Sequence, residues 1–459
     1  MPPVLKTRAL ARYFLLSSGS VILSGCLLSP EYVPPTTRLP ASYSITAPVR
    51  SDPKFTATWW ESFKDPALSQ IVEQAFSQNL DLAQARERVK EAYATARATA
   101  PATDLSGRVE AISDTNGADG TQASATFLID LFGGKRKRAE AARARADAAA
   151  YGAQNARLVI LSGVANAYVD LRFQQASLTH KNKDIRSRRK TLRDITTLLE
   201  SGEATRLDQI RAQALLAEAR AEIPPLTTEI ARQRNRLSTL VGTPAGSEGA
   251  PVPGSGSQPQ PTAISSAGIP ADLIRTRPDI RQAERLYAAA VSETGAAEAA
   301  RYPSLSLSGK ISHPLSGDLS QSGLYAAGLN IPIFAQGSLK AAVDAQQSRA
   351  KQAFLEWRSR VLAAVEEVET ALVAVNGSHA TVAEARKVLA LNEESLSLSR
   401  QLLGGRGNAT ILDLLDRERS VTSSRARLAQ ARRQLARDHI ALNVALGLGS
   451  AVVETAQTN

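Results

Sequence analysis

The sequence has 459 residues, of which 43% are hydrophobic and only 5% aromatic, and its formal net charge is +11 at pH 7. A chain with many alanines and few aromatic residues is typical of long, closely packed helices and argues against a thick globular core. The basic residues are scattered among acidic ones, so the positive charge indicates solvated helix surfaces, and we expect no nucleic-acid partner.

The first 25 residues predict an export signal. Lys6, Arg8 and Arg12 precede a short apolar run that ends in Leu23-Ser-Gly-Cys26, an order that is typical of secretory signals. The run is too short to span a bilayer as a helix. "LSGC" resembles a bacterial lipobox, which would place a lipid on Cys26, although a chance cysteine after an ordinary signal is the alternative. Because this is the only cysteine, an intrachain disulfide is excluded.

The rest of the chain indicates two tandem copies of one structural unit. "NLDLAQARERVKEA" (79–92) resembles "RPDIRQAERLYAAA" (277–290), and "SGEATRLDQIRAQ" (201–213) resembles "GRGNATILDLLDR" (405–417). Repeats of this kind indicate repeated supersecondary units. We therefore predict a lipid-anchored N-terminal segment at 26–64, a first repeat at 65–242, a Pro/Gly/Ser-rich linker at 243–268, a second repeat at 269–447 and a C-terminal tail at 448–459.

Each copy contains the same elements in the same order. A helix of moderate length comes first, near 66–100 and 271–301. The predicted elements that follow are a β-hairpin at 102–132 and at 303–334, and then a long helical hairpin at 134–241 and at 336–446.

The outgoing helices of these hairpins, 134–200 and 336–403, contain no proline. At about 1.5 Å per residue each would be on the order of 100 Å long. Pro224-Pro225 predicts a kink or break in the returning helix 205–241. The second returning helix, 408–446, has no such prolines.

The outgoing helix of the second copy carries two apolar stripes. Leu389, Leu396 and Leu403 recur every seven residues, which is typical of a coiled-coil contact. Two stripes on nearly opposite flanks indicate neighbouring helices on both sides, as in a ring of helices. The alternative is a solitary hairpin, in which one stripe makes the contact and the other leucines are stray. The second stripe consists of Val388, Leu391, Leu398 and Leu402.

The β segments alternate between apolar and polar residues. This period of two predicts strands with one apolar face, as in a membrane barrel or a half-buried soluble hairpin. One chain offers four strands, whereas the smallest membrane barrels have about eight. Because lipid tolerates no open sheet edge, a barrel would require an oligomer. The apolar positions include Leu105, Val109, Ala123, Ala125, Phe127, Leu305, Leu307, Ile311, Tyr325 and Leu329.

Six blocks of the sequence carry a family resemblance: the lipobox, "SPEYVPPTTRLP" (29–40), "WWESFKDPALSQIVEQAFSQNLDLAQA" (59–85), "IDLFGGKR" (129–136), "IPADLIRTRPDIRQAE" (269–284) and "YPSLSLSG" (302–309). They resemble the TolC-type outer-membrane factors of bacterial efflux, in the lipoprotein branch usually called NodT-like. The resemblance covers essentially the whole mature chain. It implies a mainly α protein with a β-barrel part: a trimeric 12-stranded outer-membrane β-barrel, four strands per protomer, continuous with a long α-helical coiled-coil periplasmic barrel.

The resemblance also implies a function and partners. The chain would be a homotrimeric, passive exit duct in the cell outer membrane, with its lipid anchor in that membrane. Small molecules would be delivered by an inner-membrane pump of the RND type through a periplasmic adaptor, also called a membrane fusion protein. A type I-like polypeptide secretion duct and a non-conducting structural lipoprotein are the alternatives.

The glycine turns of the helical hairpins lie at the periplasmic tip in this family. The resemblance therefore places the aperture gate at Asp413, Asp416 and Asp208. An alternative is that these acids only complement the dipoles of helix N-termini. Ala409 departs from the family pattern, because the best-known member has a latch arginine there; Arg406 and Arg206 are the candidate replacements. The expected adaptor-docking residues are Gly202, Thr205, Gly405, Gly407 and Thr410.

No enzyme, metal or cofactor motif stands out, so the lipid on Cys26 is the one attached group that we expect. Met1 is the only methionine, which excludes a thioether copper relay in the mature chain. Nucleotide-binding loops and nucleophile elbows are absent from the sequence. The histidines are widely separated and lack the spacing of metal ligands; they are His180, His313, His379 and His439.

Overall fold

The computed structural model describes residues 31–44, 57–99, 105–113, 119–247, 254, 256–261, 269–315, 321–403 and 410–450. Cys26 of the expected lipobox, and Gly405 and Gly407 of the second glycine turn, lie outside these residues. The chain divides into two compact units, and each contains segments from both sequence copies. Unit 1 comprises Met1–Arg38, Arg86–Gly152 and Asp279–Arg360, and unit 2 comprises Leu39–Ala85, Ala153–Pro278 and Val361–Asn459.

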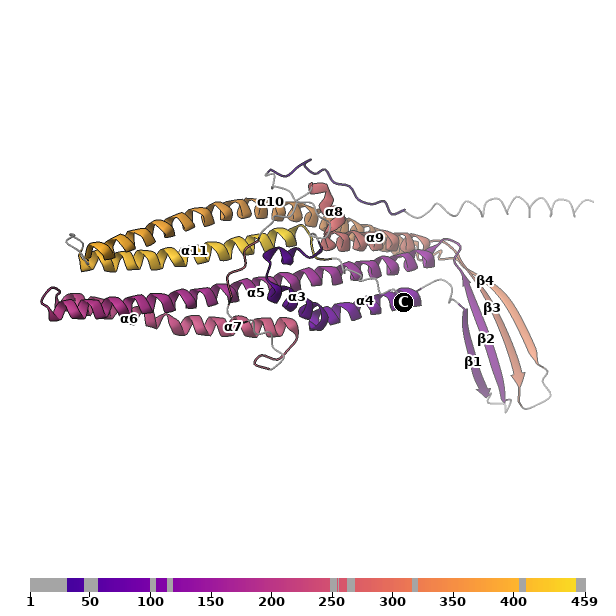
Figure 1. The fold of residues 1–459 in the computed structure, drawn as a ribbon. Helices are drawn as coiled ribbons and strands as arrows, with labels where there is room; N and C mark the ends of the chain where they lie inside the picture. The colour runs from indigo at the N-terminus through magenta and orange to yellow at the C-terminus, as the bar shows by residue number, and fades with distance from the viewer. Residues whose placement is uncertain are drawn as a thin grey trace, which may run out of the picture. The chain divides into compact units, whose positions relative to one another are not determined.

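Unit 1 contains one antiparallel sheet whose strands lie side by side in the order β1-β2-β3-β4 (Figure 1). The central pairing of β2 with β3 joins the two sequence copies. Leu105 lies opposite Phe127, Phe127 opposite Leu307, and Leu307 opposite Ala327. The strands are β1 Leu105–Ser113, β2 Asp119–Ile129, β3 Ser304–Pro314 and β4 Ser322–Asn330.

This register gathers the apolar side chains of all four strands on one face, because directly opposed residues share a face of a sheet. The predicted alternation is thereby confirmed. The apolar side chains are exposed: Val109 retains 78% and Tyr325 86% of its accessible surface. In a soluble half-buried hairpin, other parts of the chain would cover this face. The described chain leaves the apolar face uncovered.

Helices α4 (Leu80–Ala98), α5 (Gly134–Glu200), α9 (Pro278–Ala299) and α10 (Gln336–Leu403) contribute to unit 1. Polar contacts join three of these helices. Tyr93 donates to Asp147 Oδ1 across 3.2 Å, and Arg281 donates to the Tyr151 hydroxyl across 2.7 Å. The bounds of α5 and α10 agree with the predicted outgoing helices.

Unit 2 is built around an aromatic core near the start of the described chain. The 3-10 helix η2 (Trp59–Phe63) and helix α3 (Pro66–Gln78) pack against residues of α5 that include Leu161 and Tyr168. Trp59 is fully buried, and its Nε1 donates to the Leu448 carbonyl across 3.1 Å. The core therefore ties the N-terminal part of unit 2 to its C-terminal end.

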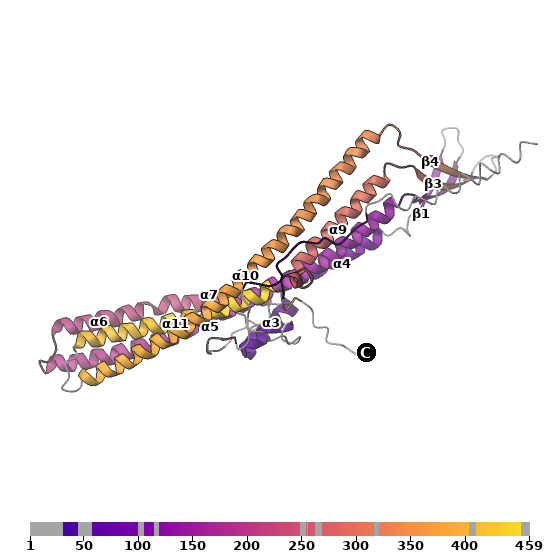
Figure 2. The ribbon, with the colours of Figure 1, turned by 90° about the horizontal axis from the view of Figure 1, so that it is seen from above.

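The returning helices complete unit 2: α6 (Arg206–Ala221), α7 (Ile223–Val241) and α11 (Ile411–Ala445). Figures 1 and 2 show α6 and α7 along α5, and α11 along α10. Ile185 packs against Leu216, and Leu396 packs against Leu414. The helix break predicted at Pro224-Pro225 is confirmed, because α6 ends just before α7 begins, whereas α11 is continuous.

The shorter helices differ from the prediction. The expected helix 66–100 is divided at Asn79, whose Oδ1 accepts from Leu82 N (3.0 Å) and caps α4. Asn79 Nδ2 also donates to the Leu240 carbonyl (2.8 Å), which fixes the break against α7. The expected helix 271–301 consists of η4 (Pro270–Asp272), α8 (Leu273–Thr276) and α9, because Pro278 disfavours a helical residue before it.

Candidate functional site

The tip of the first helical hairpin is a tight turn followed by a capped helix. Gly202 has a φ of +82°, in the left-handed region that favours glycine. Thr205 is the N-cap of α6, and its backbone N and Oγ1 both donate to Asp208 Oδ2, at 3.1 and 2.6 Å. Asp208 N donates back to Thr205 Oγ1 at 3.2 Å. These reciprocal bonds form a capping box.

The second copy repeats this geometry at the start of α11. Thr410 N and Oγ1 donate to Asp413 Oδ2 at 3.0 and 2.7 Å, and Asp413 N donates to Thr410 Oγ1 at 3.2 Å. Both aspartates thus lie in the first turn of a helix, where the helix-dipole alternative places them, and they also make capping contacts. Ala409 and Arg406, the departure from the family pattern and one candidate replacement, lie outside the described residues.

Two of the gate candidates, Asp208 and Asp413, remain charged despite these contacts. Hydrogen bonds from Thr205 and Thr410 hold the pKa values of Asp208 and Asp413 below their ordinary value. Asp416 is exposed, 3.8 Å from Arg419 on the same helix. Arg206, the other replacement candidate, contacts Gln209 within α6. Each hairpin tip therefore presents ionised carboxylates at the start of its returning helix.

A buried polar cluster above the tips escaped the sequence reasoning. The side chain of Glu418 on α11 is only 4% exposed, and its Oε1 accepts from Ser187 (2.9 Å), Thr191 (2.8 Å) and Arg400 (2.8 Å). Nearby, Thr422 donates to Asp184 Oδ1 across 2.7 Å. These bonds connect α5 of the first copy with α10 and α11 of the second. Nothing in the sequence distinguishes this glutamate from the exposed acids around it.

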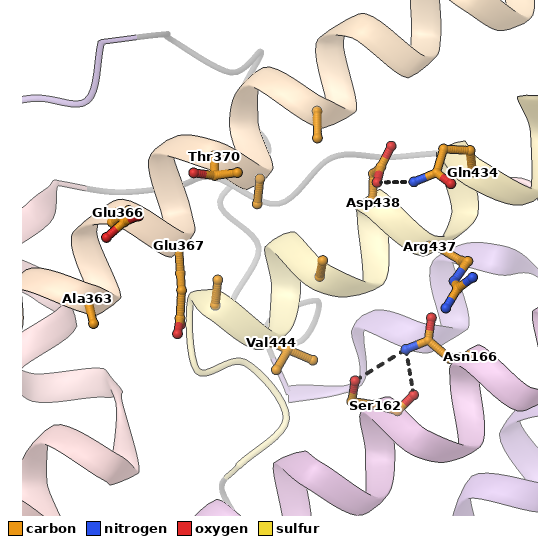
Figure 3. Close-up of a pocket in the computed structure, with 14 residues that line it drawn as sticks. Ser162, Asn166, Ala363, Glu366, Glu367, Thr370, Gln434, Arg437, Asp438 and Val444 are labelled. Carbon is orange, nitrogen blue, oxygen red and sulfur yellow. Dashed lines mark hydrogen bonds between the residues drawn. The ribbon is translucent and has the colours of Figure 1, made fainter. Parts of the chain in front are cut away.

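A cavity of about 940 Å³ lies between α5, α10 and α11 within unit 2 (Figure 3). Glu366, Glu367 and Asp438 bring carboxylates to its wall, and Asp438 accepts from Gln434 across 2.8 Å. Small side chains leave the remaining space open. Among the described residues, no group of His, Cys, Asp and Glu is arranged to hold a metal ion. The small side chains are Ala363, Ala371, Ala374, Ala441 and Ala445.

His439 is the one histidine in the core of unit 2. Its ring is fully buried beside Trp59 and Phe63, and Nε2 lies 3.2 Å from Ser62 Oγ. Burial lowers the pKa of His439 to about 4, with a smaller contribution from His379. The imidazole is therefore neutral near pH 7 and has a packing role in this geometry.

The sheet and helix α10 each present an apolar surface that the described part of the chain does not cover. β1 and β4 are edge strands within the described chain, and the shared apolar face of the sheet is exposed. In the helical part, Val388, Leu391 and Leu398 of the second predicted stripe are exposed on α10. No helix in the described ranges is long and apolar enough to cross a bilayer.

Known proteins match this chain along most of its length. The family model for outer membrane efflux proteins matches residues 71–243 and 269–448. Nodulation protein T of Rhizobium leguminosarum bv. trifolii is 36% identical over 451 residues, which cover 94% of this chain and 96% of the relative. The toluene efflux pump outer membrane protein TtgF of Pseudomonas putida is 29% identical, covering 95% of this chain and 97% of TtgF. The solved outer-membrane channel OprN superposes with a TM-score of 0.84 at 27% identity, over 93% of this chain and 100% of OprN.

Proposed function

Because the chain belongs to the outer membrane efflux protein family, we propose that it is the outer-membrane subunit of a tripartite efflux system and acts as a passive exit duct for small molecules. The four-stranded sheet, with two edges and an exposed apolar face, is the observation that carries this proposal. In lipid, such edges require partners. Three copies would close a barrel of twelve strands, above the minimum of about eight.

The proposed assembly has defined partners. A homotrimer would close the barrel and cover the second stripe of α10. A periplasmic adaptor of the membrane fusion protein class and an inner-membrane pump of the RND type would deliver the cargo. This arrangement is supported by the relative TtgF, whose name describes the outer membrane protein of a toluene efflux pump. A lipid on Cys26 would anchor the N-terminus in the outer membrane.

The hairpin tips are the proposed periplasmic aperture. Asp208, Asp413 and Asp416 would bring several carboxylates near the axis of a trimer, where their field attracts cations and their mutual repulsion favours widening. The capping bonds keep Asp208 and Asp413 ionised, because they lower the pKa of each carboxyl. The adaptor would dock on the turns themselves, at Gly202, Thr205, Gly405, Gly407 and Thr410.

The duct is tested by single-channel recording from the purified lipidated protein in planar bilayers. A trimer that conducts ions supports the proposal. A well-folded protein that gives no conductance and no hollow particle by electron microscopy would favour a structural lipoprotein instead.

The aperture residues are tested in the same bilayers. Asp413→Asn with Asp416→Asn keeps an acceptor for the capping box and removes two charges from each chain. We expect the cation-to-anion permeability ratio to fall severalfold and the basal conductance to change. The matched control, Asp344→Asn with Glu356→Gln, removes two exposed charges from α10 in unit 1 and should leave both quantities unchanged. Equal selectivity in the aperture variant and the control would remove these aspartates from the gate.

A further inference from the structure

A row of exposed cations lies on α5 in unit 2, close to the tip of the first hairpin. None of its five side chains forms an ion pair or a hydrogen bond with the described part of the chain. Asp194, the exposed acid that follows the row, forms no ion pair there either. We call this set the basic row; it consists of Lys183, Arg186, Arg189, Lys190 and Arg193.

The basic row lies on the face of α5 that the chain's own helices leave free. Ser187 and Thr191 of α5 donate to Glu418 of α11, at 2.9 and 2.8 Å. Ile185 packs against Leu216 of α6. These contacts use one side of α5, and the basic row occupies the remaining arc of the helix. The row is therefore not part of a contact between the described helices of this chain.

The second copy has no such row at the corresponding positions. The match of 201–213 with 405–417 sets an offset of 204 residues between the two hairpin tips. The counterparts on α10 are all exposed, but they comprise one cation and two acids. A mixture of both signs is typical of a solvated helix surface, so solubility does not account for five unpaired cations on α5. The counterparts are Lys387, Ala390, Glu393, Glu394 and Ser397.

The spacing of the row indicates the shape of a partner. Four of its cations are three, four and three residues apart, which is heptad spacing. Like charges at these spacings repel, so the row destabilises α5 unless acids of another molecule face it. Heptad spacing also keeps the cations in line along about 15 Å of helix, where a second helix lying lengthwise can face them. The row is thus matched to an extended acidic helix. The four cations are Lys183, Arg186, Lys190 and Arg193.

The row also lies close to the turn on which the adaptor would dock. Between Arg193 and the end of α5 at Glu200 there is about 10 Å of helix. Gly202 and Thr205 of the proposed docking turn follow directly. An adaptor helix that docks on this turn and continues along α5 would therefore meet the basic row.

From these observations we propose that the basic row binds an acidic helix of the periplasmic adaptor, lying along α5 beside the first hairpin tip. This contact deepens the proposed function and rests on the adaptor that it includes. Because α10 has no such row, the adaptor would distinguish the two hairpins of each chain and extend along the first one only. Opposite charges would also speed association, and the gain would fall with rising salt.

The experiment uses the purified full-length protein in mild detergent and synthetic helical peptides as probes. One peptide carries glutamates at the spacing of the row, and a second carries glutamines at the same positions. Binding is measured by fluorescence anisotropy at low and at high salt. The row variant is Arg186→Gln with Lys190→Gln. The matched control, Arg220→Gln with Arg236→Gln, removes two exposed, unpaired cations from α6 and α7 in the same unit.

The glutamate peptide should bind the wild type and the control alike. It should bind the row variant roughly tenfold more weakly at low salt, which corresponds to about 1.4 kcal/mol. The glutamine peptide should not bind, and a reversed row, Arg186→Glu with Lys190→Glu, should prefer a lysine peptide of the same spacing. No binding of the glutamate peptide, or equal weakening in the row variant and the control, would overturn the proposal.

Three parallel measurements distinguish other partners and the duct itself. Cosedimentation with peptidoglycan sacculi that depends on the row, without peptide binding, would assign the row to the cell wall. Loss of the oligomer in the row variant, seen by sedimentation, would assign it to a contact between copies of this chain. Either result overturns the acidic-helix site. A wild type that conducts in bilayers without row-dependent peptide binding refutes only this site, whereas a wild type that does not conduct refutes the duct.

Discussion

At the scale of single residues, the most consequential polar group is the carboxylate of Glu418. It is buried and accepts three hydrogen bonds that connect helices of both sequence copies. Glu418→Ala would leave the hydroxyls of Ser187 and Thr191, and part of the Arg400 guanidinium, without their acceptor. We expect a loss of about 2–4 kcal/mol in the free energy of unfolding, measured as a lower thermal midpoint in detergent.

Glu393 provides the matched control for this substitution. It pairs with Arg425 across the same two helices, α10 and α11, but its side chain is 44% exposed. Exposed ion pairs contribute less than about 1 kcal/mol, so Glu393→Ala should shift the midpoint little. If both substitutions lowered the midpoint equally, burial would not be the reason for the importance of Glu418.

His439 predicts a pH dependence of stability. Its folded pKa, about 4, is below its ordinary value of 6.5 because burial disfavours the charged ring. The contribution of the buried, neutral His439 ring to the free energy of unfolding is therefore fully present above about pH 6.5. It is lost as the pH falls towards 4, by at most about 3 kcal/mol. His439→Gln should flatten this part of the curve of thermal midpoint against pH, whereas exposed His379→Gln should not. A curve for His439→Gln that parallels the wild type would assign the acid sensitivity to other groups.

Sequence reasoning located residues whose roles follow from local patterns and missed those whose roles follow from tertiary contacts. The start of a returning helix near Thr205 was predicted from the glycine turn before it, and the structure begins α6 at Arg206. The burial of Glu418 and His439 depends on helices far apart in the sequence, so no local pattern announces it. The lipidation of Cys26 and the docking role of Gly405 and Gly407 were expected from resemblance to known sequences, and they stay predictions.

At the scale of elements, the break between α6 and α7 is the clearest difference between the copies. Pro224 lies in the first turn of α7, where its missing N–H has little cost. We expect Pro224→Ala to change the free energy of unfolding by less than about 1 kcal/mol. Arg427→Pro would place a proline in the middle of continuous α11 and should cost about 3 kcal/mol or more.

Arg427→Ala is the control for the loss of the side chain, and thermal unfolding followed by circular dichroism measures all three variants. A tolerated Arg427→Pro would mean that α11 can be divided as its counterpart is. In that case the prolines of the first copy would not explain why its returning helix is divided into α6 and α7.

The elements show why some boundaries could be predicted. The bounds of α5 and α10 were predicted correctly because glycine turns and prolines mark their ends. The strands could be located because apolar and polar residues alternate within each of them. The break at Asn79 was missed, since α3 and α4 form one uninterrupted helical pattern. Asparagine before Leu-Asp-Leu is a signal that could have located it, because asparagine is a preferred N-cap. The contact that fixes the break, with Leu240, comes from another helix.

At the scale of the whole molecule, the exposed stripe of α10 predicts how copies associate. Leu391 is 57% and Leu398 51% exposed, although both are leucines on a helix that has already packed its other stripe. Leu391→Ser with Leu398→Ser should convert the proposed trimer into monomers in detergent while circular dichroism remains that of the wild type. Lys387→Ser with Glu394→Ser is the control on the same helix. Sedimentation that shows an intact trimer for the leucine variant would place the contact elsewhere.

The ladder between β2 and β3 also limits the order in which the molecule can form. Its partners, such as Ala125 and Gly309, come from different copies. Pairing strands so far apart in the sequence is slow, because the entropy of closing the loop is lost before the contacts form, and an isolated hairpin of two strands is marginal in water. A nascent chain that has crossed into the periplasm with only its first copy cannot yet offer a sheet to the bilayer. In the proposed outer-membrane placement, insertion would therefore wait for almost complete synthesis, and premature termination would leave the first hairpin without a partner strand.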